Sequence, residues 1–312
     1  MVRRDDVTFT SGGEAIAAWF YHPASDGASA PVPCIVMAHG FAGVKEARLD
    51  AFAERFVAAG MACLVFDYRH FGASAGEPRQ VVDIAHQRED WRSALRYARS
   101  LPTVDARAIG AWGTSLGGGH VLEFAARDAG VRAAVLHLPL VDALATGKHE
   151  GVVATAKLVC SGLRDLGHAA LRRKPYLIPV VGRPGSVAFM STPDARPGYF
   201  SIVTNAPAWK NKVAARVVVA MALFRPITSS RRVRCPVLFV VGETDTITPT
   251  SVTLKAARLT PRAEILSLPG SHFDAYLGEQ FERAVSAETA FFVKHLLAQQ
   301  PSLVTRGAAG AL

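Results

Sequence analysis

The chain has 312 residues, of which 50% are hydrophobic and 20% charged; this composition excludes wholesale disorder and suits one large α/β domain with an insertion, or two domains. No apolar run approaches the roughly 20 residues that span a bilayer, and no apolar segment follows the N-terminal arginines, so we expect neither a membrane span nor a secretory signal. The net charge is +9, but the basic residues are scattered along the chain and no aromatic residues are interleaved with them, so we expect no nucleic-acid partner.

The first 140 residues alternate between segments typical of strands and segments typical of helices. A hairpin opens the chain, and continuous apolar runs, expected of strands buried on both faces, follow it. The expected strands cover 7–10, 16–21, 34–38, 62–66, 108–112 and 131–138. Apolar residues at helical spacing predict helices between them, over 49–59, 83–100 and 121–127. The alternation predicts an α/β fold.

Residues 141–231 interrupt this alternation and are too long for an ordinary connection between a strand and a helix. An amphipathic helix is expected at 152–171 and a second, very apolar helix at 208–224. Pro and Gly punctuate 175–205, where we expect short strands or loops. We interpret 141–231 as an inserted cap. Its apolar surface has two interpretations, core packing or the wall of an acyl-binding pocket.

The α/β order resumes after the insertion. The expected elements are a strand at 236–242, a helix at 249–258, a strand at 263–268 and a long helix at 278–298. The predicted organisation is a core formed by 1–140 and 232–300, the cap at 141–231, and a flexible C-terminal tail at 301–312.

One segment carries the strongest chemical signal. Gly113, Ser115 and Gly117 form a Gly-x-Ser-x-Gly pattern between an expected strand and an expected helix. A serine at such a sharp turn is presented for nucleophilic attack, and glycines two positions away avoid clashes with neighbouring backbone. The start of the following helix would offer free N–H groups to an oxyanion. The pattern predicts Ser115 as a nucleophile; the alternative is an ordinary turn rich in Gly and Ser.

A histidine and several carboxylates follow the expected strands. Asp245 comes after the next-to-last strand and His272 after the last, and active-site groups of open α/β sheets gather at such carboxyl ends. In the chain order Ser, Asp, His, these residues predict a triad in which His272 is the base and Asp245 orients it. Asp274 and Asp142 also lie at strand ends and are the alternative acids. Asp245 has a further interpretation, as a helix N-cap.

These motifs resemble the α/β-hydrolase superfamily over essentially the whole chain outside the cap. His39-Gly40-Phe41 is similar to the family's motif after its third strand. Residues 67–79 look like a loop found in bacterial serine esterases and dienelactone-hydrolase-like relatives, and shared by thioesterases and polyketide transferases. The resemblance implies a mostly parallel eight-stranded sheet with helices on both faces and an inserted cap. It also implies an oxyanion hole formed by the backbone N–H groups of Leu116 and Phe41, and a structural role for His39.

Serine at position 115, where haloalkane dehalogenases and epoxide hydrolases have aspartate, predicts acyl transfer. The expected function is a serine hydrolase that cleaves small-molecule carboxylic esters or thioesters through an acyl-enzyme, with no metal or organic cofactor. Two alternatives remain open, an acyltransferase of the polyketide-transferase type and a non-catalytic ligand-binding relative.

The four cysteines show no C-x-x-C pattern and no Cys/His cluster. They predict free thiols in a reducing, cytoplasmic compartment. The sequence leaves the oligomeric state open, and a homodimer is among the assemblies expected.

Overall fold

The computed structural model describes residues 2–23, 30–146 and 152–298; the tail expected at 301–312 lies outside these ranges. Eight of the described strands form one sheet in the order β1-β2-β4-β3-β5-β6-β9-β10. They are β1 (Arg3–Ser11), β2 (Glu14–His22), β3 (Val32–Ala38), β4 (Ala62–Phe66), β5 (Val104–Thr114), β6 (Val131–His137), β9 (Val237–Gly242) and β10 (Ala263–Leu268). The β1–β2 and β2–β4 pairs are antiparallel and the other neighbours are parallel. The predicted fold class, with a mostly parallel eight-stranded sheet, is confirmed.

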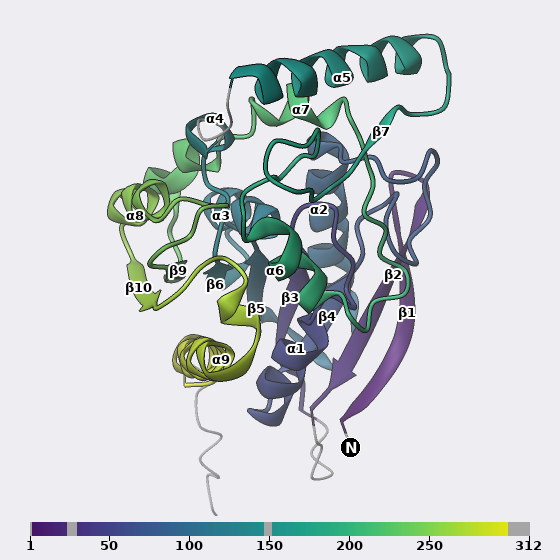
Figure 1. The fold of residues 1–312 in the computed structure, drawn as a ribbon. Helices are drawn as coiled ribbons and strands as arrows, with labels where there is room; N and C mark the ends of the chain where they lie inside the picture. Colours follow the sequence, from purple (N-terminus) through teal and green to yellow (C-terminus); the bar gives the residue numbers. More distant parts are fainter. Residues whose placement is uncertain (1, 24–29, 147–151, 299–312) are drawn as a thin grey trace, which may run out of the picture.

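Helices cover both faces of this sheet (Figure 1). On one face α1 (Leu49–Ala58) packs against α9 (Gly278–Phe292), and on the other lie α2 (Ile84–Ser100) and α3 (Leu116–Arg127). The helix α8 (Thr250–Leu259) connects β9 to β10. Strands β4 and β9 are buried throughout, which explains why they read as continuous apolar runs in the sequence.

The order of the strands brings several loops to one edge of the sheet. Strand β5 pairs in parallel with β3 on one side and β6 on the other, and β6 pairs in parallel with β9. Since these strands run in the same direction, the loops that follow them open at the same edge. That edge holds the residues that the sequence singled out for chemistry.

The segment between β6 and β9 holds the described part of the expected cap. Its elements are α4 (Ala143–Thr146), α5 (Val152–Ala170), β7 (Leu177–Ile178), α6 (Ala195–Ile202), β8 (Val213–Ala214), α7 (Val217–Met221) and the 3₁₀ helix η2 (Pro226–Arg232). The helix expected at 152–171 is confirmed as α5, which crosses the top of the molecule above α7 in Figure 1.

Two expectations for this segment need correction. The stretch 175–205 holds the expected short strand, β7, and loops, but it also contains the helix α6, which was not expected because Pro197 and Gly198 are poor helix formers. The apolar helix expected at 208–224 is helical only over α7. Before it, β8 pairs with β7 and both of its residues are fully buried.

The end of the described chain agrees with its prediction. The long helix expected at 278–298 is α9 followed by a short π-helical segment, η4 (Val293–Leu297). Within the described ranges, each helix is too short or too polar to span a bilayer.

Candidate active site

Ser115 lies at the turn between β5 and α3. Its φ of 52° and ψ of −117° belong to a region that residues other than glycine rarely adopt. A Cβ on Gly113 would lie 2.4 Å from the backbone of Gly117, and a Cβ on Gly117 would lie 2.7 Å from the carbonyl oxygen of His39. The two glycines are therefore required by close backbone approaches, and the turn has the geometry expected of a nucleophile elbow.

His272 and Asp245 form a buried pair at the ends of β10 and β9. The Nδ1 atom of His272 lies 2.7 Å from Oδ2 of Asp245. Asp245 also accepts hydrogen bonds from the backbone N–H groups of Ile247 and Thr248, at 2.8 and 2.7 Å, and from the Thr248 hydroxyl at 2.8 Å. Burial would raise the pKa of Asp245, but His272 and these hydrogen bonds outweigh it and lower that pKa below its ordinary value.

The two alternative acids have other partners. Asp142 forms hydrogen bonds of 3.0 and 2.9 Å with the guanidinium of Arg225. Asp274 accepts the backbone N–H of Ser271 at 2.6 Å. Within the described chain, the carboxylate that His272 contacts is that of Asp245 rather than either alternative.

The loop after β3, residues 39–45, packs against Ser115. A Cβ on Gly40 would lie 3.0 Å from the Cβ of Ser115. The next two carbonyl oxygens accept hydrogen bonds from the inserted segment, Phe41 from the Tyr199 hydroxyl at 2.8 Å and Ala42 from Nε1 of Trp209 at 3.1 Å. The inserted segment therefore holds the loop that carries one of the two predicted oxyanion donors. The other donor, Leu116, is buried in the first turn of α3.

A buried ion pair anchors the far end of this loop. Asp67 accepts hydrogen bonds from the backbone N–H and the Nζ of Lys45, at 2.7 and 2.8 Å. Burial would lower the pKa of Lys45, but Asp67 and Glu46 outweigh it and raise that pKa, so the ammonium group remains charged. Burial also lowers the pKa of His39, whose Nδ1 lies 2.9 Å from the Gly40 carbonyl oxygen. A neutral, buried His39 suits the structural role expected of it.

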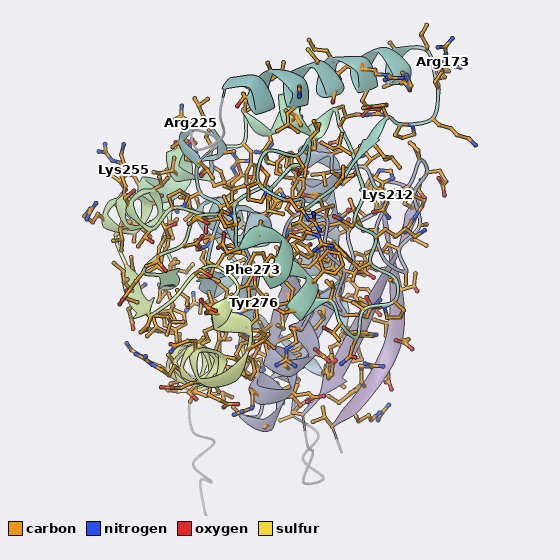
Figure 2. The ribbon with its side chains drawn as sticks, viewed as in Figure 1. Arg173, Lys212, Arg225, Lys255, Phe273 and Tyr276 are labelled. Atoms are coloured by element: carbon orange, nitrogen blue, oxygen red, sulfur yellow. The ribbon has the colours of Figure 1, made fainter. Side chains whose placement is uncertain are left out.

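Ser115 and His272 line one small cavity of about 30 Å³. Tyr199 of α6 lines it too, as do Phe273 and Tyr276, which Figure 2 shows beside α6 and above α9. Burial raises the pKa of both tyrosines, so their phenols stay protonated at neutral pH. A hydroxyl and an imidazole paired with a carboxylate thus line one cavity, the arrangement that nucleophilic catalysis requires.

Comparison with known proteins agrees with this geometry. The family described as serine aminopeptidase S33 matches residues 29–265, which run from the segment before β3 into β10. The chain belongs to this family of α/β-hydrolases. The resemblance drawn from the sequence and the predicted hydrolase class are confirmed.

Three relatives of this α/β-hydrolase indicate the range of its family. The quorum-quenching protein AidA of Acinetobacter baumannii is 42% identical over 286 residues, covering 92% of this chain and 93% of AidA. The thiohydrolase aneE of Aspergillus aculeatus is 28% identical over 275 residues, covering 83% and 84%. The polyketide transferase grgF of Penicillium sp. is 34% identical over 185 residues, covering 59% and 60%. The crystal structure of GrgF matches with a TM-score of 0.81 at 25% identity, covering 95% of this chain and 99% of GrgF.

A second cavity of the α/β-hydrolase, of about 330 Å³, also reaches Ser115. Its walls come from α4, α5, α7 and the stretch 189–192, and the side chains are mostly aliphatic or aromatic. The polar side chains among the described lining residues are those of Ser and Thr; none is acidic or basic. Because an unpaired charge is costly to bury, such a space suits a neutral, apolar group.

The sequence did not reveal the residues that support the site. Thr248 hydrogen-bonds Asp245, and Tyr199 and Trp209 hold the loop after β3. The last two lie more than 150 residues from their partners, and their one sequence signal was their aromatic character. No group of three or more His, Cys, Asp or Glu side chains in the described ranges is arranged to bind a metal.

Proposed function

We propose that the chain is a serine hydrolase that cleaves carboxylic esters or thioesters through an acyl-enzyme. One observation carries the proposal: Ser115, at the elbow, shares a cavity with His272, and His272 contacts the carboxylate of Asp245 at 2.7 Å.

In the acylation step, Oγ of Ser115 attacks the substrate carbonyl carbon while Nε2 of His272 accepts the serine proton. Asp245 accepts the Nδ1–H of His272, which leaves a lone pair on Nε2 and stabilises the imidazolium that forms. The lowered pKa of Asp245 keeps this carboxylate ionised at neutral pH. His272 then gives the proton to the leaving group, and water releases the acyl group by the reverse sequence.

The oxyanion of the tetrahedral intermediate accepts hydrogen bonds from the backbone N–H groups of Leu116 and Phe41. Loss of one such donor typically removes about 3 kcal/mol of transition-state stabilisation. The hydrogen bonds from Tyr199 and Trp209 to the carbonyl oxygens of Phe41 and Ala42 support this role, because they fix the backbone beside the donor.

The acyl group would occupy the larger cavity. We propose that 141–231 forms a cap over a core made of 1–140 and 232–300, with α5 and α7 as walls of the acyl site. A cap in this position excludes water while the tetrahedral intermediate forms. The apolar lining favours a neutral acyl chain over a charged one.

Acyl transfer to an alcohol or an amine is the second candidate. Its support is the similarity to the polyketide transferase grgF. The two reactions share the acyl-enzyme and differ in the group that attacks it, so the acceptor decides between them.

We further propose a small-molecule substrate, no nucleic-acid partner and a cytoplasmic location. Cys34, Cys63 and Cys235 are buried free thiols and Cys160 is an exposed one, which suits a reducing compartment. The homodimer remains a prediction, and light scattering after gel filtration measures it.

Hydrolysis of methyl octanoate, followed as release of acid, tests the proposal. The wild-type protein should release octanoate and Ser115→Ala should not. Formation of an octanoyl ester or amide when an alcohol or amine is added would instead support a transferase. Binding without release of acid would support a non-catalytic relative.

A further inference from the structure

The two cavities at Ser115 differ in size and in chemistry. We propose that Phe273 closes the side of the site that receives the leaving group, an inference that rests on the proposed function. The substrates are then neutral esters with an apolar acyl chain and a small alcohol portion.

The position of His272 decides which cavity receives the leaving group. When the tetrahedral intermediate collapses, the bond between the carbonyl carbon and the alcohol oxygen breaks, and that oxygen takes its proton from the His272 imidazolium. The alcohol oxygen must therefore lie beside His272. His272 lines the small cavity and is absent from the described walls of the large one. The alcohol portion occupies the small cavity, and the acyl chain occupies the large one.

The small cavity limits the size of the alcohol. It holds about 30 Å³, against about 330 Å³ for the acyl side. A cavity needs about 10–15 Å³ of such volume to hold one water molecule. The space beside His272 therefore fits only a small alcohol such as methanol, while the cavity on the acyl side accepts a chain of many atoms.

Phe273 separates the small cavity from an outer groove. The groove, of about 620 Å³, runs between the start of α6 and the segment 269–280. Among the described residues, Phe273 is the one that lines both the cavity and the groove. A Cβ on Gly198 would lie 2.2 Å from Cδ2 of Phe273, so the ring packs directly against the backbone of α6. The side chain is buried, with 6% exposed.

This wall also restricts the second half of the reaction. The group that attacks the acyl-enzyme gives its proton to His272, so it enters the same small cavity. Water fits there, whereas a large alcohol or the long thiol of a carrier-bound thioester requires the Phe273 ring to move. The wall therefore favours small-alcohol esters over bulky thioesters, and water over a bulky acceptor.

The test compares two esters with the same acyl chain and different alcohols. Methyl octanoate and benzyl octanoate have leaving groups of similar acidity and different size. We expect the wild-type enzyme to show a kcat/KM at least tenfold higher for the methyl ester. Phe273→Ala should raise the benzyl-to-methyl ratio of kcat/KM at least tenfold, and Phe273→Leu should raise it by less. The matched control is Leu277→Ala, which removes a side chain that lines the groove but not the cavity, and should leave the ratio unchanged.

An alkyl fluorophosphonate counts the competent sites in each preparation, because its fluoride leaving group fits any cavity. Labelling of Ser115 combined with equal use of both esters by the wild type would overturn the inference and leave the proposed function intact. The inference would equally be overturned if Phe273→Ala and Phe273→Leu react with the fluorophosphonate at Ser115 but keep the wild-type benzyl-to-methyl ratio of kcat/KM. Absence of Ser115 labelling in the wild type would instead refute the proposed function.

Discussion

Replacement of Asp245 by Asn changes one atom of the hydrogen-bond network around His272. The carboxylate accepts four hydrogen bonds, two at Oδ1 from backbone N–H groups and two at Oδ2 from His272 and the Thr248 hydroxyl. The asparagine oxygen can keep the backbone pair at Oδ1. The amide nitrogen then takes the place of Oδ2 and donates where the carboxylate accepted, while the Thr248 hydroxyl can rotate to accept from it.

The imidazole has no such freedom. With an N–H group facing its Nδ1, His272 must carry its proton on Nε2, where it can no longer accept the proton of Ser115. We therefore expect kcat to fall by about 10³–10⁴-fold, or about 4–5.5 kcal/mol of activation free energy, while the fold is retained.

The assay is the kcat for methyl octanoate, with circular dichroism and urea unfolding to establish the fold of each variant. The matched controls are Asp142→Asn and Asp274→Asn, which change carboxylates that bind Arg225 and the Ser271 backbone, and each should lower kcat less than tenfold. A folded Asp245→Asn enzyme with kcat within tenfold of wild type would refute the reasoning. A larger loss in Asp142→Asn would assign the acid to the segment after β6.

Three further predictions follow from the same contacts. Tyr199→Phe removes the hydrogen bond to the Phe41 carbonyl and should lower kcat about five- to tenfold with little change in KM, since such a bond is worth about 1 kcal/mol; equal kcat values for variant and wild type would contradict it. Leu158→Ser, in the wall of the large cavity, should raise KM more for methyl octanoate than for methyl acetate, because each buried methylene contributes about 0.8 kcal/mol. The control is Leu163→Ser, on the same helix, where the leucine is 56% exposed. Equal changes in KM for the two esters in Leu158→Ser would contradict the proposed acyl site. The folded-state pKa of Asp245 lies below its ordinary value of 3.8, so the ionised carboxylate contributes fully to the free energy of unfolding above pH 3.8, and this contribution disappears as the pH falls through the folded-state pKa. Between about pH 5 and pH 3, urea unfolding should therefore show a smaller loss of unfolding free energy for Asp245→Asn than for wild type. Identical losses in the two proteins would contradict this prediction.

The sheet could be predicted because its strands leave strong local patterns. The apolar run of β4 covers residues 62–66 in both the sequence analysis and the structure, since a strand buried on both faces has apolar side chains in both directions. The sequence signal for Ser115 was equally local, because the glycines at 113 and 117 are required by contacts within the turn and with the adjacent strand.

The inserted segment could not be predicted in the same way. Helix α6 contains Pro197 and Gly198, so its helical state depends on tertiary contacts such as the packing of Phe273 on Gly198. Val213 and Ala214, which precede α7, are buried in the β7–β8 pair, and burial does not distinguish a helix from a strand. Tyr199 and Trp209 acquire their importance from carbonyl groups far away in the sequence, and a single sequence does not report such contacts.

Covalent labelling tests most directly whether Ser115 is the nucleophile. Wild-type protein treated with an alkyl fluorophosphonate should gain one phosphonyl group, and peptide mass spectrometry should locate it on Ser115. Ser115→Ala should be neither labelled nor active towards methyl octanoate, while it unfolds in urea like the wild type. Labelling at another serine, or turnover by a folded Ser115→Ala variant, would contradict the account.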